Sequence, residues 1–115
     1  GDMIEFKYED EDKMKRGAVR VEHPSLKVTL GKTKVFFPVI DLSVTGVAFK
    51  PGRYAKKFSG ATGKIAYLSV WFDKDLIVSN IKAKVVRAVD EMIAFQFQDV
   101  SQEHEKRLDK LVLEI

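Results

Sequence analysis

Most of the chain alternates between apolar and polar side chains with a period of two, which is the pattern of β-strands that bury one face. The clearest example is LKVTL at residues 26–30, and Val19 and Val21 alternate in the opposite parity. The same alternation predicts further strands within residues 34–43, 46–50, 65–72, 81–89 and 92–98. Six or seven short strands without a long intervening helix predict a mainly β fold, an antiparallel barrel or sandwich.

The period changes only near the C-terminus. There the apolar residues fall at positions i, i+3, i+4 and i+7, namely Leu108, Leu111, Val112 and Ile115. Ser101 suits a helix N-cap. The spacing therefore predicts an amphipathic helix over about 101–113, packed on the barrel. The connection over residues 50–64 is rich in glycine and basic residues, and we expect a loop there with Tyr54 or Phe58 tucked down.

Composition narrows the class of protein. A chain of 115 residues favours one domain. The absence of cysteine excludes disulfides and thiolate chemistry and fits a reducing compartment. There is no apolar run long enough for a membrane span, and the first residues lack the pattern of a signal peptide. We therefore expect a cytoplasmic protein.

Charge is modest overall but unevenly distributed. The net charge of +3 is too small to indicate a nucleic-acid-binding protein. An acidic run at residues 9–12 is followed at once by the basic residues Lys13, Lys15, Arg16 and Arg20. We expect residues 1–15 to form a flexible charged arm and residues 16–115 to form the barrel domain with its helix.

The sequence contains no motif typical of a catalytic or metal-binding site. His23 and His104 fall on separate predicted elements, and the acidic run lacks the spacing of a calcium loop. SGATGK at residues 59–64 departs from the phosphate-binding loop, because residue 58 is phenylalanine and Ile65 follows the lysine. We expect no enzyme, no metal site and no cofactor.

Two short motifs stand out against this background. In KRGAVR, Arg16 and Arg20 lie four apart around a glycine, where a helix is not expected. In DLSVTG, Asp41 and Ser43 are two apart, so in an extended strand they would project side by side. Taken alone, Asp, Ser and Thr before Gly46 are ordinary turn chemistry that could simply join two strands.

In this order the two motifs, RGAVR and then DLSVTG, resemble the paired signature of the PilZ domain family, RxxxR followed by D/N-x-S-x-x-G. The resemblance extends through residues 83–112, which look like the strand, hairpin, strand and helix that close such domains. It implies a six-stranded antiparallel barrel with a C-terminal helix. Ala94 departs from the glycine expected in its strand. Because it lies far from both motifs in sequence, we expect it to affect packing more than binding.

The usual ligand of PilZ domains is cyclic di-GMP, so the resemblance implies a binding site for this bacterial second messenger. A guanidinium matches the O6 and N7 acceptors of guanine, and a carboxylate at Asp41 matches the N1–H and N2 amine donors of its other edge. Ser43 can donate or accept there. Gly46 is expected either to take a positive φ or to let the backbone approach the ligand. The phosphates would be neutralised by Arg16, Arg20 and Lys15.

The composition of the charged arm, with its like charges and few apolar residues, also suggests a switch. The arm would close over the ligand and present a changed surface to an unidentified protein partner. Arg53 and Trp71 are weaker candidates for ligand contact. The alternatives are a PilZ-like interaction module that binds no nucleotide, and a barrel for single-stranded nucleic acid. The latter would need several aromatic side chains on one solvated face among lysines, whereas the phenylalanines here mostly alternate as core residues, so we expect neither DNA nor RNA to bind. Whether one or two ligand molecules bind stays open.

Overall fold

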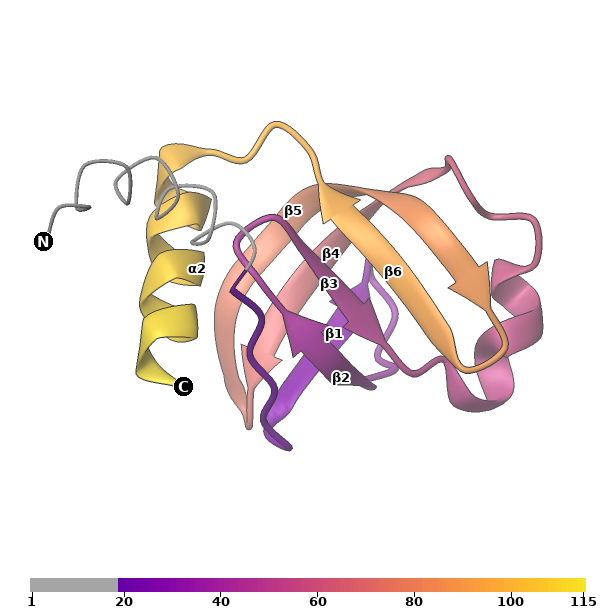
Figure 1. Cartoon of the computed structure of the whole chain (residues 1–115), viewed down its shortest axis with the longest axis horizontal. Helices are drawn as coiled ribbons and strands as arrows, with labels where there is room; N and C mark the ends of the chain where they lie inside the picture. Colours follow the sequence, from indigo (N-terminus) through magenta and orange to yellow (C-terminus); the bar gives the residue numbers. More distant parts are fainter. Residues whose placement is uncertain (1–18) are drawn as a thin grey trace, which may run out of the picture.

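The computed structural model describes residues 19–115 and contains, in that range, a closed antiparallel barrel with one α-helix after it (Figure 1). The strands follow one another around the barrel in the order β1-β2-β3-β6-β5-β4. Their bounds are β1 Leu26–Leu30, β2 Phe37–Leu42, β3 Gly46–Phe49, β4 Ile65–Phe72, β5 Asp75–Val89 and β6 Met92–Phe97, and the helix α2 spans Gln102–Glu114. The predicted fold, a six-stranded antiparallel barrel with a C-terminal helix, is confirmed.

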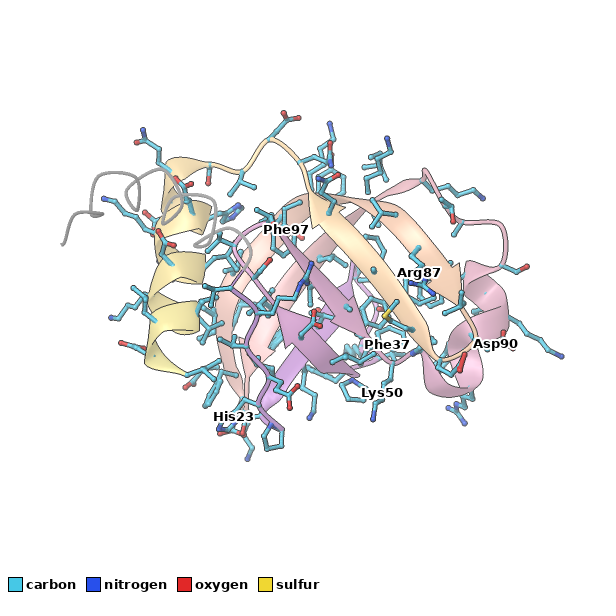
Figure 2. All side chains as sticks on the ribbon, in the orientation of Figure 1. His23, Phe37, Lys50, Arg87, Asp90 and Phe97 are labelled. Carbon is cyan, nitrogen blue, oxygen red and sulfur yellow. The ribbon has the colours of Figure 1, made fainter. Side chains whose placement is uncertain are left out.

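The barrel interior is filled by the apolar half of the alternating pattern. Every strand contributes a side chain that is buried, and Phe37 and Phe97, labelled in Figure 2, are only 5% and 7% exposed. Phe49 is fully buried and lies with its ring centroid 4.8 Å from that of Phe37 and 5.8 Å from that of Phe95. Burying one such side chain contributes about 1.5–3 kcal/mol, so these aromatic contacts are a major source of the barrel's stability.

Two strand boundaries differ from those that the pattern predicts. The strand expected over residues 81–89 begins earlier, at Asp75, because β5 continues through a bulge at which its pairing with β4 shifts register. Asn80 takes a left-handed conformation there, with φ of 54°. At the other end of the described chain, Val19 and Val21 form no strand: Val21 makes a single antiparallel bridge with Leu42.

The connection from β3 to β4 is not wholly a loop. It contains a 3-10 helix, η1, over Gly52–Phe58. The expectation that Tyr54 or Phe58 packs downward is confirmed for both, since their rings lie 5.9 and 6.0 Å from that of Phe37, each edge to face. In Figure 1, η1 lies at one end of the barrel and α2 at the other, so that the two helical segments flank the barrel.

The C-terminal helix begins and packs much as its sequence predicts. The Oγ of Ser101 accepts a hydrogen bond from the backbone N–H of His104 at 3.0 Å, which confirms the N-cap. Glu103 accepts from Arg107 at 2.7 Å, and this hydrogen bond lowers the pKa of the Glu103 carboxyl. Leu108, Leu111 and Val112 are the buried residues of the helix, which packs on β5. No helix among residues 19–115 is sufficiently long and apolar to cross a membrane.

At the start of β3 the backbone passes unusually close to β6. Gly46 pairs with Gln96, and a Cβ placed on Gly46 would lie 2.4 Å from the backbone oxygen of Phe95. Because the obstructing atom is backbone rather than a side-chain tip, it cannot rotate away. A glycine is therefore required here for steric reasons.

Gly46→Ala should destabilise the protein by ~1–3 kcal/mol, the typical cost of forcing an added methyl group into closely packed surroundings. Urea unfolding followed by circular dichroism measures this as a lower midpoint with the same slope. An unchanged midpoint would show that β3 and β6 are not held together as closely as described.

Leu108→Ala should cost ~2–5 kcal/mol of unfolding free energy, because Leu108 is fully buried between α2 and the barrel. Leu113 provides the matched control, since it lies on the same helix with 79% of its surface exposed. Leu113→Ala should change stability by no more than about 0.5 kcal/mol in the same urea titration. Equal effects of the two substitutions would contradict the packing of α2 on β5.

Candidate functional site

A backbone pair fixes the first described residues to the barrel wall. The N–H of Val21 donates to the carbonyl of Leu42 at 2.8 Å, and the N–H of Leu42 donates back to Val21 at 2.9 Å. This reciprocal pair extends the β2 edge by one bridge. It places Arg20 diagonally opposite Asp41, the last outward-facing residue of β2.

Arg20 and Asp41, which the sequence places in separate motifs, meet in the structure. The Nη1 of Arg20 donates to the Oδ1 of Asp41 at 2.9 Å. The two side chains are 55% and 29% exposed. An ion pair this accessible to water is worth only about 0–1 kcal/mol, so a ligand can replace it at little cost. The pair therefore holds both groups in place while leaving their hydrogen-bonding capacity available.

Ser43 lies elsewhere than expected. β2 ends at Leu42, and Ser43 begins the turn into β3 with none of its surface exposed. Its Oγ lies 3.0 Å from the Oγ1 of Thr45 and accepts from the N–H of Thr45 at 3.2 Å. The expectation that Ser43 projects beside Asp41 is wrong, because the hydroxyl is turned inward to satisfy the backbone of the turn. In this conformation Ser43 shapes the turn that follows Asp41.

Gly46 also differs from its expected role. Its φ is not among the positive values of the described residues, so no left-handed turn explains the glycine. In the structure, the close approach that it permits is to the backbone of β6. Gly46 thereby brings β6 against the turn, and the N–H of Phe97 donates to the carbonyl of Thr45 at 2.8 Å.

A hollow of about 350 Å³, the Arg20 hollow, opens on the outer face of β3 and β6 next to these residues. Its wall is formed by Arg20, Thr45, Gly46, Val47, Ala48, Val86, Ala94, Phe95 and Gln96. Ala94 thus lines the same hollow as Arg20 and Gly46. The expectation that its distance in sequence separates it from the motifs is wrong, because the pairing of β3 with β6 brings Ala94 opposite Ala48.

The remaining candidates do not reach this hollow or cannot be placed. Lys15 and Arg16 lie outside the described residues. Arg53 lies on η1, where it donates to the hydroxyl of Tyr54 at 3.0 Å, and this hydrogen bond raises the pKa of the guanidinium. Trp71 lies on β4, across the barrel from β3 in the ring of strands. Arg87, labelled in Figure 2, is an exposed residue of β5 at a register shift opposite Ala94.

Besides Thr45, which belongs to DLSVTG, the hollow offers one polar side chain that the motifs do not reveal, Gln96. Gln96 contributes an exposed amide from β6, and Thr45 contributes from the turn. The alternation of β6 marks Gln96 only as an outward-facing residue, so no local sequence signal singles it out. Arginine, carboxylate and amide together can both donate to and accept from the edges of a planar heterocycle. Within residues 19–115 there is no cluster of His, Asp or Glu that could hold a metal ion.

Comparison with known proteins identifies the family of the chain and supports its fold. The sequence matches the PilZ domain family over residues 14–114. No curated protein sequence matches the chain. Among solved structures, Escherichia coli YcgR in complex with c-di-GMP is 19% identical, with a TM-score of 0.60 over 83% of this chain and 43% of that one. Klebsiella MrkH in its apo state is 20% identical, with a TM-score of 0.65 over 83% of this chain and 47% of that one.

The Bacillus subtilis inhibitor of motility MotI/DgrA has the same fold at 13% identity, with a TM-score of 0.65 over 84% of this chain and 48% of that one. The chain thus spans less than half the length of these three proteins. At such identities the structures demonstrate a shared fold, whereas the family match rests on the sequence itself and covers nearly the whole chain. The protein belongs to the PilZ domain family.

Proposed function

We propose that this PilZ domain is a receptor for cyclic di-GMP that binds at the Arg20 hollow. The observation that carries the proposal is that Arg20, which lines this hollow, meets Asp41 of the second motif. Two further observations support it. The chain belongs to the PilZ domain family, and one of its structural neighbours, E. coli YcgR, is in complex with c-di-GMP.

Guanine suits the pair of charged groups at the hollow. Its O6 and N7 accept two parallel hydrogen bonds from one guanidinium, which Arg20 can supply. Its N1–H and N2 amine donate to one carboxylate, which Asp41 can supply. Because the ion pair between the two side chains is exposed and weak, guanine can take over both partners with a net gain of hydrogen bonds.

The rest of the ligand would be held by Arg20 and by basic residues close to it in sequence. Arg20 and the two basic residues before it in sequence, Lys15 and Arg16, are assigned to the two phosphates. Ser43 and Gly46 act through the turn, which fixes Asp41 and the start of β3. The domain works by binding rather than by catalysis, and a cytoplasmic location stays a prediction.

Calorimetric titration of the purified protein with cyclic di-GMP tests this proposal. Binding is expected, and Arg20→Ala should weaken it by about 1–3 kcal/mol, the value of one bidentate guanine contact, or roughly 5- to 150-fold in Kd. Asp41→Ala should have an effect of similar size. GTP should bind far more weakly, because it presents one guanine instead of two.

Arg53→Ala is the matched control, because it removes an exposed arginine that the structure places on η1, away from the hollow. Its affinity for cyclic di-GMP should equal that of the unaltered protein. Absence of binding at tens of micromolar would instead favour the alternative function, an interaction module that binds no nucleotide. Equal losses for Arg20→Ala and Arg53→Ala would place the ligand elsewhere.

We further propose that the segment over residues 9–17 closes over the ligand and so changes the surface offered to a protein partner. Such a segment must be better ordered with ligand than without it. Hydrogen exchange followed by mass spectrometry should show slower exchange across residues 9–20 with saturating cyclic di-GMP. Unchanged exchange, in the presence of calorimetric binding, would rule out the closing segment and leave the receptor function intact.

A further inference from the structure

A second and larger hollow, of about 680 Å³, lies on the opposite side of the barrel. We call it the Trp71 pocket. It opens where the loop between β1 and β2 leaves the sheet and faces the outer side of β4 and β5. In the closed order of strands β4 stands opposite β3, so this pocket and the Arg20 hollow are on different faces. Nothing in the nucleotide site accounts for it.

The aromatic wall of the pocket is fixed in position. The Nε1 of Trp71 donates to the Oγ1 of Thr29 at 3.1 Å, and Thr29 is only 5% exposed. Phe36 meets the Trp71 ring edge to face, with centroids 5.1 Å apart. Since the indole N–H is already satisfied within the protein, the remaining ring surface is available for apolar contact.

Hydrogen bonds hold the loop that carries Phe36. The N–H of Gly31 donates to the carbonyl of Tyr67 on β4 at 2.8 Å. The Oγ1 of Thr33 donates to the carbonyl of Leu30 at 2.7 Å. The loop is therefore tied to both β1 and β4, so the pocket is preformed and a partner need not order it.

The floor of the pocket is the bulge between β4 and β5. Asn80 takes its positive φ there, and its N–H donates to the Oγ of Ser69 at 3.2 Å. Bulges and left-handed non-glycine residues concentrate next to binding sites, where they redirect side chains. Here the bulge interrupts the ladder beneath Trp71 and leaves room above it.

Large apolar side chains are exposed to solvent in and around the pocket. Phe36 and Tyr67 are 46% and 51% exposed. The exposed aliphatic side chains of Ile65 and Leu76 lie on the same face, since Ile65 is two residues before Tyr67 and Leu76 pairs with Trp71. A half-buried tryptophan beside exposed tyrosine, phenylalanine and aliphatic side chains is typical of protein-binding hot spots. Aliphatic side chains add nothing to base stacking, so the set favours a peptide over a nucleic acid.

The charge at the pocket has one sign. Lys32 and Lys34 are exposed on its loop, and neither has an ion-pair partner among residues 19–115. Among residues 19–115, no carboxylate lines the pocket. Two ammonium groups beside an apolar surface complement a segment that carries carboxylates next to aromatic or aliphatic side chains.

We propose that the Trp71 pocket docks an extended acidic segment of a partner protein, with an apolar side chain of that segment inserted between Trp71, Phe36 and Tyr67. The barrel is closed and offers no strand edge there, so recognition proceeds through side chains rather than by strand addition. This docking goes beyond nucleotide binding and uses none of its residues.

Trp71 is the single tryptophan of the chain, and its emission therefore reports on the pocket alone. The probes are a short synthetic peptide in which Asp and Glu alternate with Phe and Leu, and a twin in which every acid is replaced by lysine. The acidic peptide should change Trp71 emission in a saturable manner. The basic twin should bind at least about tenfold more weakly, because like charges would then face each other.

Charge reversal in the protein provides the sharpest variant. K32E combined with K34E should invert the preference, so that the basic twin binds better than the acidic peptide. K56E combined with K106E makes the same change of charge at two exposed lysines away from the pocket and should leave the preference unaltered. Tyr67→Ala should weaken the acidic peptide roughly tenfold, as for a hot-spot aromatic. Arg20→Ala should leave the affinity for the acidic peptide unchanged. Loss of peptide binding can therefore be told apart from loss of cyclic di-GMP binding.

Three outcomes would overturn the proposal. The first is no saturable change in Trp71 emission with either peptide. The second is an equal response to both peptides, which would remove the charge argument. The third is binding of oligo(dT) at the pocket, with a steep salt dependence and no response to the acidic peptide, which would assign the pocket to single-stranded nucleic acid instead.

Discussion

Closure of the sheet is the constraint on which the rest of the structure depends. Because β1 pairs with β4, the six strands described between residues 26 and 97 form a closed ring, with one face of the sheet turned to the core and the other turned outward. The core takes up the large apolar side chains, including Phe37, Phe49 and Phe95. Groups that act on other molecules are therefore confined to the outer faces and the loops. The two hollows occupy opposite outer faces for this reason.

At the proposed nucleotide site, a weak ion pair is positioned by stronger backbone contacts. The exposed ion pair between Arg20 and Asp41 contributes little to stability. The backbone pair between Val21 and Leu42, together with the close approach of Gly46 to β6, determines where those two side chains lie. Such an arrangement suits a receptor, because a ligand exchanges partners with the charged groups without disturbing the barrel beneath them.

The sequence was sufficient to predict the strands, the helix and its Ser101 cap, because these depend on alternation, spacing and local capping. It was not sufficient to predict the start of β5, where the bulge at Asn80 breaks the alternation. Ser43 was misplaced because the same residues that form a binding motif also form a turn. Ala94 and Gln96 could not be assigned to the site at all, since only the pairing of β3 with β6 brings them to it.

The most direct test of the central claim, that cyclic di-GMP binds at the Arg20 hollow, is an NMR titration of the labelled protein with the nucleotide. The account predicts that the largest amide shifts occur at Val21, Gly46 and Gln96, around the hollow, while the indole resonance of Trp71 on the opposite face stays nearly unchanged. Shifts centred on Trp71 and the loop between β1 and β2, with none around Gly46, would contradict the account and move the nucleotide to the other side of the barrel.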